Sequence, residues 1–222
     1  LIYYAFQKSD AKLLFIVDSD DTIMPNAVDE IIKNDKKQDS NDVAGYFYLC
    51  EYPESQFDIK PLETGKKTHF IELNAQRNDK IDTCCQVYKT SILKKYVFPD
   101  FHEEFMPESV IWNKIDQDYK IVEINEIIYS REYQEGGYTK SGRKKNVNSP
   151  LGSMESNRYL LDAKIPFVRR LKANLLFTAY GLIAKKSLTE IFKESTNKLL
   201  TILSVPFSSC IAIFWREKWK SN

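Results

Sequence analysis

Three carboxylates stand within four positions of this chain, at Asp18, Asp20 and Asp21, directly after the apolar run 13–17. A short apolar run of this kind is typical of a strand that is buried on both faces. In open α/β sheets, ligands bind in the crevice beyond the carboxyl ends of such strands. Clustered carboxylates repel one another unless a cation or a hydroxyl-rich ligand lies between them, and Mg²⁺ often takes one or two carboxylates together with substrate phosphates. We therefore expect a metal-assisted site for a phosphorylated ligand.

The acidic motif by itself leaves two enzyme classes open. The pattern Asp18-x-Asp20-x-Thr22 resembles the haloacid dehalogenase-like phosphatases, in which the first Asp is a nucleophile and the second a general acid. It also resembles the DxD motif of nucleotide-sugar glycosyltransferases with the GT-A fold, which grips the ribose and a metal-bound diphosphate. A third interpretation is an acidic turn that caps the next helix. The phosphatase interpretation is the weaker enzyme hypothesis, because it needs a small residue where Asp21 stands and a Gly in the later acidic segment 78–82.

Further segments favour the glycosyltransferase interpretation, because they follow one another in the order of that family. Residues 17–25 (VDSDDTIMP) closely resemble the DSDD segment of family 2 glycosyltransferases, and residues 87–93 (VYKTSIL) resemble their strand-to-helix segment. Residues 98–112 resemble the loop and helix that carry the family's catalytic carboxylate, and residues 119–133 the strand that follows. The resemblance covers about residues 12–140. It implies a GT-A-like, Rossmann-related mixed α/β sheet flanked by helices, and transfer of a sugar from a nucleotide-diphosphate donor to a glycan or lipid-linked hydroxyl, as in surface polysaccharide synthesis.

The resemblance also implies roles for individual residues. Asp18 and Asp20 would contact the donor, and Asp20 and Asp21 would hold Mg²⁺ or Mn²⁺. Glu108 falls on the position of the catalytic base, which takes the proton from the attacking acceptor hydroxyl if it lies within hydrogen-bond reach. The relatives have Asp there, so Glu108 is longer by one methylene. A carboxylate at a helix start is also favourable for dipole reasons alone, which is the structural alternative for Glu108.

The basic, glycine-containing segment 134–150 is expected to form a loop after the last strand of the sheet. In family 2 enzymes the loop at this place can contact the donor diphosphate, so the resemblance assigns donor binding to Thr139 and Lys140. Lysine and hydroxyl groups suit phosphate oxygens, and a closing loop can exclude water from a transferase site. The alternative is a solvated basic loop without a binding function.

Composition and chain organisation narrow the setting. Lys and Arg number 32 and Asp and Glu 31, so net charge implies no nucleic-acid polymer as partner. The four cysteines lack CxxC spacing, which favours a reducing, cytoplasmic setting. The family normally opens with a strand, a helix and a second strand before the DxD strand, whereas this sequence reaches it within about a dozen residues of its start. We therefore expect residues 1–150 to form a partial catalytic domain that lacks the first strands, with a non-catalytic fragment as a further alternative.

The last third of the chain, residues 151–222, is expected to be a helical tail. Residues 165–186 show the periodicity of an amphipathic helix. Residues 199–215 contain no charge and are flanked by Lys198 and by a cluster of basic and aromatic residues. The run is shorter than the 20 or so apolar residues of a spanning helix and contains Pro206, so it fits a helical hairpin at the inner face of the membrane. A helix packed against protein remains the alternative.

Overall fold

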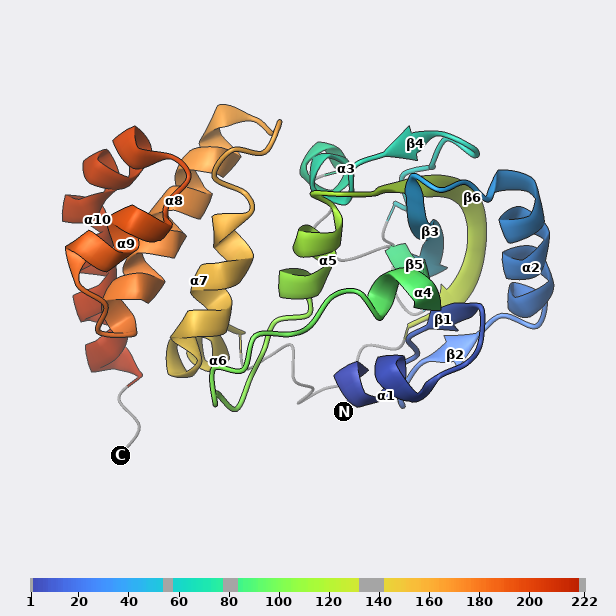
Figure 1. The fold of residues 1–222 in the computed structure, drawn as a ribbon, viewed down its shortest axis with the longest axis horizontal. Coiled ribbons are helices and arrows are strands. Elements are labelled where there is room, and N and C mark those ends of the chain that lie inside the picture. The colour runs from blue at the N-terminus through green and yellow to red at the C-terminus, as the bar shows by residue number, and fades with distance from the viewer. Residues whose placement is uncertain (1, 54–57, 78–83, 132–141, 220–222) are drawn as a thin grey trace. The chain divides into compact units, whose positions relative to one another are not determined.

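The computed structural model describes residues 2–53, 58–77, 84–131 and 142–219 (Figure 1). The chain divides into two compact units that interleave in sequence. Unit 1 comprises Leu1–Val97 and Ile115–Gly137, and unit 2 comprises Phe98–Lys114 and Tyr138–Asn222. Because this division reports compactness alone, the expected domain boundary near residue 150 stays a prediction.

Unit 1 is built on one mixed β-sheet. Its strands are β1 (Leu13–Phe15), β2 (Thr22–Ile23), β3 (Val43–Glu51), β4 (Lys67–Thr68), β5 (Cys84–Lys89) and β6 (Lys120–Ser130). The order across the sheet is β1-β5-β3-β6-β2, and β4 also pairs with β6. β3 and β6 pair in parallel, whereas the other pairs are antiparallel. The expected mixed α/β sheet is confirmed, and so are the strands that the sequence predicts at 43–52, from its β-favouring aromatic residues, and at 84–89 and 119–129.

The core of unit 1 lies around the central strand β3, whose residues from Val43 to Cys50 are all buried. Helix α2 (Ala27–Gln38) adds Ala27 and Ile31 to this core. Gly45 lets β3 approach β5 closely, because a Cβ at that position would lie 2.2 Å from the Val87 carbonyl oxygen. The other helices in the described part of this unit are α1 (Ile2–Lys8), α3 (Phe70–Arg77) and α4 (Thr90–Leu93).

Two expectations for unit 1 are wrong. The strand β1 is half-buried rather than buried on both faces, because it lies at one end of the strand order and pairs, among the described strands, with β5 alone. The alternation of the segment 68–73 predicts a strand, but Thr68 ends the short strand β4 and residues 70–73 begin helix α3. The carboxylate of Asp116 accepts hydrogen bonds from the backbone N–H groups of Phe70 and Ile71 and so caps this helix.

Unit 2 is helical. Helix α5 (Ser109–Ile115) is followed by α6 (Gly142–Asn148), α7 (Pro150–Arg158), α8 (Phe167–Ile183), α9 (Leu188–Glu194) and α10 (Lys198–Lys218). α8 packs against α7 and against α10, and its buried side chains include Phe177 and Tyr180. The helical tail and its helix near residues 165–186 are confirmed. The expected hairpin at the end is wrong, because α10 continues as one helix through Pro206.

Candidate functional site

The acidic turn, which we define as residues 18–21, links the end of β1 to β2. It closes with a hydrogen bond of 3.2 Å from the backbone N–H of Asp21 to the carbonyl oxygen of Asp18. The N–H of Asp18 donates to the hydroxyl oxygen of Tyr129 at 2.9 Å. β2 pairs with the end of β6, with Ile23 opposite Tyr129. The turn is therefore fixed against the carboxyl end of β6.

One carboxylate of the turn is held by two side chains from the end of β6. Asp21 has a side-chain exposure of 7%, and Arg131 Nε lies 3.7 Å from its Oδ2. The Tyr129 hydroxyl bonds to the same carboxylate, and burial, followed by this hydrogen bond, raises the pKa of Tyr129. The phenol therefore stays neutral and donates to Asp21. The Arg131 guanidinium also lies over the Tyr129 ring, 5.3 Å from its centroid, so the three side chains form one cluster.

The other two carboxylates of the turn, Asp18 and Asp20, are exposed. Partial loss of hydration raises the pKa of Asp18, the negative charges of Asp21 and Asp20 raise it further, and Arg131 acts in the opposite direction. The ionised form of Asp18 is thus less favourable here than in water, and a cation beside it would offset that free-energy cost. This electrostatic state agrees with the expected crowding of carboxylates.

The carboxylate oxygens of the acidic turn are the kind of donor that Mg²⁺ and Mn²⁺ prefer. Among the described residues, no group of three His, Cys, Asp or Glu side chains is arranged to hold a metal ion. An all-protein cage is not required, because Mg²⁺ commonly takes one or two carboxylates and completes its shell with phosphate oxygens and water. A carboxylate has about four lone-pair sites, so Asp21 can accept from Tyr129, pair with the Arg131 charge and still offer an oxygen. The residues present fit a metal that is shared with a diphosphate.

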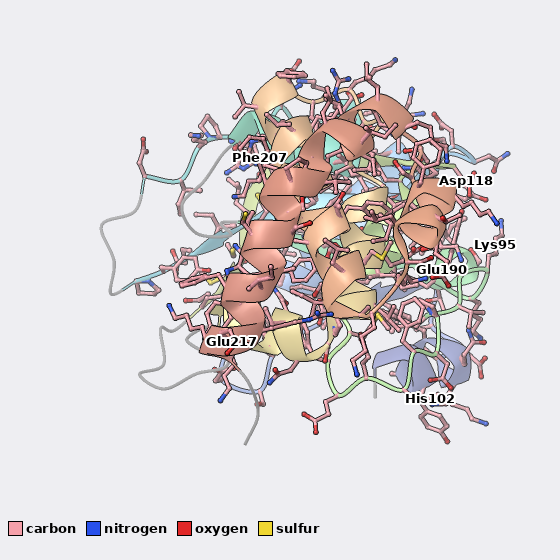
Figure 2. All side chains as sticks on the ribbon, turned by 90° about the vertical axis from the view of Figure 1, so that its left-hand side faces the viewer. Lys95, His102, Asp118, Glu190, Phe207 and Glu217 are labelled. Carbon is pink, nitrogen blue, oxygen red and sulfur yellow. The ribbon has the colours of Figure 1, made fainter. Side chains whose placement is uncertain are left out.

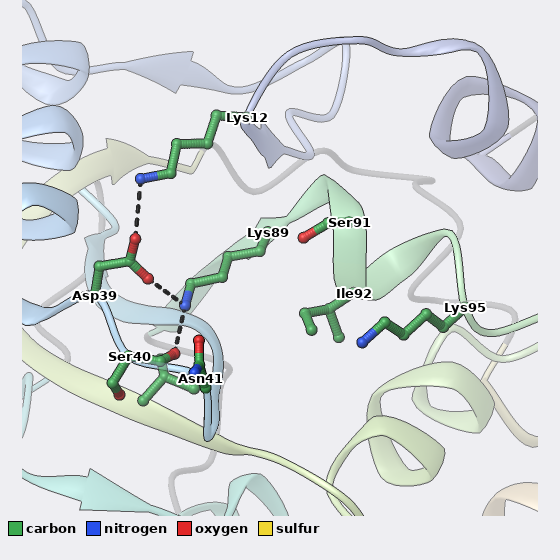
Figure 3. Close-up of a pocket in the computed structure, with 9 residues that line it drawn as sticks. Lys12, Asp39, Ser40, Asn41, Lys89, Ser91, Ile92 and Lys95 are labelled. Carbon is green, nitrogen blue, oxygen red and sulfur yellow. Dashed lines mark hydrogen bonds and ion pairs between the residues drawn. The ribbon is translucent and has the colours of Figure 1, made fainter.

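A cavity of about 370 Å³ in unit 1 lies at the opposite end of β1 from the acidic turn (Figure 3). It is lined by Lys12, Lys89 and Lys95 among others, but its cations already have partners. The Asp39 carboxylate lies between Lys12 and Lys89, at 3.1 Å and 2.5 Å from their Nζ atoms. Lys95 donates to the Tyr119 hydroxyl at 2.9 Å. We read this cluster as a structural network that ties α2 to β1 and β5.

Glu108 lies in unit 2, exposed and directly before α5. Its carbonyl oxygen accepts from the N–H of Ile111 at 2.9 Å, so it begins the first turn of the helix as expected. Burial lowers the pKa of Lys145, and the negative charge of Glu108 acts against that shift. The Lys145 ammonium and the Glu108 carboxylate are therefore close enough to interact electrostatically. The Lys145 Nζ also lies 4.5 Å from the centroid of the Phe105 ring. Glu108 therefore has a cationic neighbour in Lys145.

The loop before Glu108 is attached to the start of α7 by Glu103. The two oxygens of this carboxylate accept from the N–H groups of Leu151 at 2.8 Å and Gly152 at 2.9 Å. The loop also packs closely, since a Cβ on Gly152 would lie 3.0 Å from atoms of Met106 and Pro107. Glu103 thus supplies the acceptor that the orphan donors of a helix start require. Its part in the structure is to position the loop.

The other predicted site residues are divided between the two units and the part of the chain that is not described. Thr139 and Lys140 lie outside the described residues, as does the segment 78–82 of the phosphatase hypothesis. Asp18, Asp20 and Asp21 are together in unit 1, and Glu108 belongs to unit 2. Sequence reasoning missed the anchoring residues Tyr129, Arg131 and Glu103. Local sequence gave no signal for them, because each contacts a segment far away along the chain.

Comparisons with known proteins give a match at the level of structure. No protein-family model matches the sequence, and no curated protein sequence matches it significantly. Among solved structures, the chain is similar to S. aureus TarS 1-349, with a TM-score of 0.50, 13% identity, and coverage of 98% of this chain and 66% of that one. It is also similar to the same protein in complex with UDP-GlcNAc (TM-score 0.53, 13% identity, coverage of 93% and 59%) and with UDP (TM-score 0.51, 11% identity, coverage of 96% and 67%). The chain thus spans about two thirds of the length of these structures. At such low identity the likeness shows the fold alone, which is GT-A-like.

Proposed function

We propose that this protein transfers a sugar from a nucleotide-diphosphate donor to a hydroxyl of a glycan or glycolipid, as a family 2 glycosyltransferase. The observation that carries this proposal is the acidic turn at the end of β1. It lies beside β6 of a GT-A-like sheet, and Asp18 and Asp20 are exposed there while Asp21 is anchored. The same fold binds UDP-GlcNAc in TarS, which makes a uridine diphosphate sugar the first donor to test.

In this proposal the acidic turn binds the donor. Asp18 contacts the ribose or the sugar, and Asp20 and Asp21 hold Mg²⁺ or Mn²⁺. When bound, the metal stabilises the charge of the departing diphosphate as a Lewis acid. Tyr129 and Arg131 hold the Asp21 side chain in place. Thr139 and Lys140 are the proposed further contacts to the donor phosphates.

Glu108 is the proposed catalytic base. As the acceptor oxygen forms its bond to the anomeric carbon, the bond from that carbon to the diphosphate breaks, and Glu108 takes the hydroxyl proton. A positioned carboxylate contributes about 10²–10⁴-fold to such a step. Lys145 is a cationic neighbour of Glu108, and Glu103 fixes the loop that carries it. The proposed setting is surface polysaccharide synthesis at the cytoplasmic side of the membrane.

A donor screen tests the proposal. The longest polypeptide that the gene encodes is incubated with Mn²⁺ and a panel of labelled nucleotide sugars, and the release of nucleoside diphosphate is measured with and without glycan acceptors. We expect release with one donor class, and loss of that release in the Asp20→Asn variant. Release that persists unchanged in Asp20→Asn would remove the acidic turn from the proposed site.

A second assay separates the transferase from the phosphatase hypothesis. A dehalogenase-type phosphatase would form an acyl phosphate on Asp18 during hydrolysis of p-nitrophenyl phosphate. The GT-A-like fold supports the transferase, in which Asp18 is a ligand, so we expect no phosphorylated intermediate. A phosphoryl-aspartate trapped at position 18 would decide for the phosphatase.

A further inference from the structure

Helix α10 has an inverted distribution of polarity. The side chains that it buries are small and mostly polar: Thr201, Ser204, Ser208 and Ala212. The side chains that it exposes are large and apolar, and each is between 55% and 68% exposed: Leu199, Ile202, Leu203, Phe207, Ile213 and Phe214. At 100° per residue these six positions fall on one arc, opposite the buried ones. In Figure 2, α10 lies on the face of unit 2 that is turned toward the viewer, with Phe207 and Glu217 labelled on it.

The buried face of α10 is joined to α8 by hydrogen bonds rather than by apolar packing alone. Thr201 donates to the side-chain oxygen of Asn174 at 3.0 Å, and Ser208 donates to the Leu175 carbonyl oxygen at 3.0 Å. The hydroxyls of Ser204 and Thr178 lie 3.0 Å apart. Small residues with hydrogen bonds across the interface are the usual way in which helices associate in an apolar solvent. A helix at a water-facing surface has the opposite pattern.

The charged residues of α10 lie at the two ends of the helix. No charged residue occurs between Leu199 and Trp215. Lys198 begins the helix, and Arg216 and Lys218 lie in its last turn on either side of Glu217, while Trp215 and Trp219 are half-buried and pack on the core of unit 2. Basic side chains at the ends of an apolar segment match the anionic headgroups of a bilayer.

We propose that the outer face of α10 binds the surface of a membrane that contains anionic lipids, with the helix lying in the plane of the interface. By length and composition α10 would also suffice to cross a membrane. The neighbouring helices argue for the in-plane position. The first turn of α8 carries Arg169 and Arg170, and α8 packs on α7, which carries the ion pair of Glu155 and Arg158. A spanning α10 would draw these charges into hydrocarbon, whereas an in-plane helix inserts its apolar arc alone. This inference rests on α10 and not on the proposed function.

Flotation with lipid vesicles tests the proposal directly. The full chain is mixed with phosphatidylcholine vesicles that contain or lack about one third phosphatidylglycerol. We expect the chain to float with the anionic vesicles and to bind the neutral ones several-fold more weakly. The double variant Leu203→Glu/Phe207→Glu should lose at least about tenfold in binding, since each side chain loses its apolar contact with lipid.

A matched control is available on α2. Val28 and Ile32 have the same spacing as Leu203 and Phe207 and are also exposed, so Val28→Glu/Ile32→Glu should bind vesicles like the wild type. Thermal unfolding of both variants checks that they are folded. Equal flotation of wild type and Leu203→Glu/Phe207→Glu, or no flotation of the wild type, would overturn the proposal. A third outcome would also overturn it. If the wild type is a dimer in lipid-free solution, and Leu203→Glu/Phe207→Glu makes it a monomer without changing flotation, the arc binds a second copy of the chain and not lipid.

Cys210 offers a probe of depth. It is exposed, whereas Cys50, Cys84 and Cys85 are buried, so a fluorophore can be attached to it selectively. With anionic vesicles its emission should shift to the blue, and lipids with a nitroxide near the headgroup should quench it more than lipids with a nitroxide near the chain end. The reverse order of quenching would indicate a spanning helix and would contradict the in-plane arrangement.

Discussion

The two acidic segments of this protein, the turn 18–21 in unit 1 and the loop 103–108 in unit 2, use their carboxylates in the same way. In each, one carboxylate fixes the backbone: Asp21 through Tyr129 and Arg131, and Glu103 through two N–H groups of α7. In each, other carboxylates are exposed, as Asp20 and Glu108 are. Exposure alone would leave them mobile, so the anchored neighbour gives an accessible acid a defined position. An acidic cluster can thus combine a structural and a chemical role at adjacent residues.

The segments differ in the electrostatics of their anchors. In the turn 18–21 the anchor Asp21 adds negative charge beside Asp18 and raises its pKa. In the loop 103–108 the nearby cation Lys145 lies within the field of Glu108. The turn is therefore suited to a cationic ligand, whereas the loop already has a cation near its exposed carboxylate.

The largest effect is expected at Glu108, the proposed base in the loop that Glu103 anchors. Glu108→Gln should lower the rate of transfer by about 10²–10⁴-fold, because a general base is lost, while donor binding is retained. Steady-state kinetics with saturating donor measure this. An effect confined to KM for the acceptor would assign Glu108 to binding, and full activity would remove it from the mechanism.

The next effect tests the anchor of the turn. Tyr129→Phe removes the hydroxyl that accepts from Asp18 and bonds to Asp21, so we expect a loss of about 1–3 kcal/mol in the free energy of unfolding and about tenfold weaker donor binding. Tyr46→Phe is the matched control, since the Tyr46 hydroxyl is also buried and donates to a carboxylate, that of Asp35, at 2.9 Å. It should lose similar stability and keep donor affinity. Equal affinities in the two variants would show that the anchor does not matter for binding.

Glu103→Gln should have a smaller effect. An amide has one acceptor oxygen where the carboxylate has two, so one N–H of α7 loses its partner, and the free energy of unfolding should fall by about 0.5–2 kcal/mol. Chemical denaturation measures the loss. Glu104→Gln is the control, since Glu104 is exposed one residue away, and a loss as large in that variant would refute the assignment of Glu103 as the anchor.

The smallest effect concerns Asp18 and pH. Because its pKa in the folded state is raised, the folded protein loses stability as pH rises from the usual Asp pKa of about 3.9 through the raised value, and the loss persists at neutral pH. Asp18→Asn removes this cost. Without metal, the variant should melt at a slightly higher temperature than wild type at pH 7, and the difference should vanish below the usual Asp pKa. A lower melting temperature at pH 7 would contradict the repulsion.

Sequence patterns predicted the parts of the fold that local physics determines. Buried apolar runs located β3, β5 and β6, and periodicity located α8. They failed where a distant residue decides, as at α3, whose start is capped by Asp116, and at β1, whose burial depends on its place in the sheet. The carboxylates of the candidate site were visible in the sequence. Their anchors were not, since Tyr129 lies 111 residues from Asp18 and Glu103 lies 48 from Leu151.

Donor binding at the acidic turn is the central claim, and a calorimetric titration with UDP in the presence of Mn²⁺ tests it most directly. We expect the wild type to bind UDP in a manner that depends on Mn²⁺, and Asp20→Asn to bind it at least about tenfold more weakly. Asp29→Asn, which changes an exposed carboxylate on α2 of the same unit, should bind like the wild type. Undiminished, Mn²⁺-dependent binding of UDP by Asp20→Asn would contradict the account.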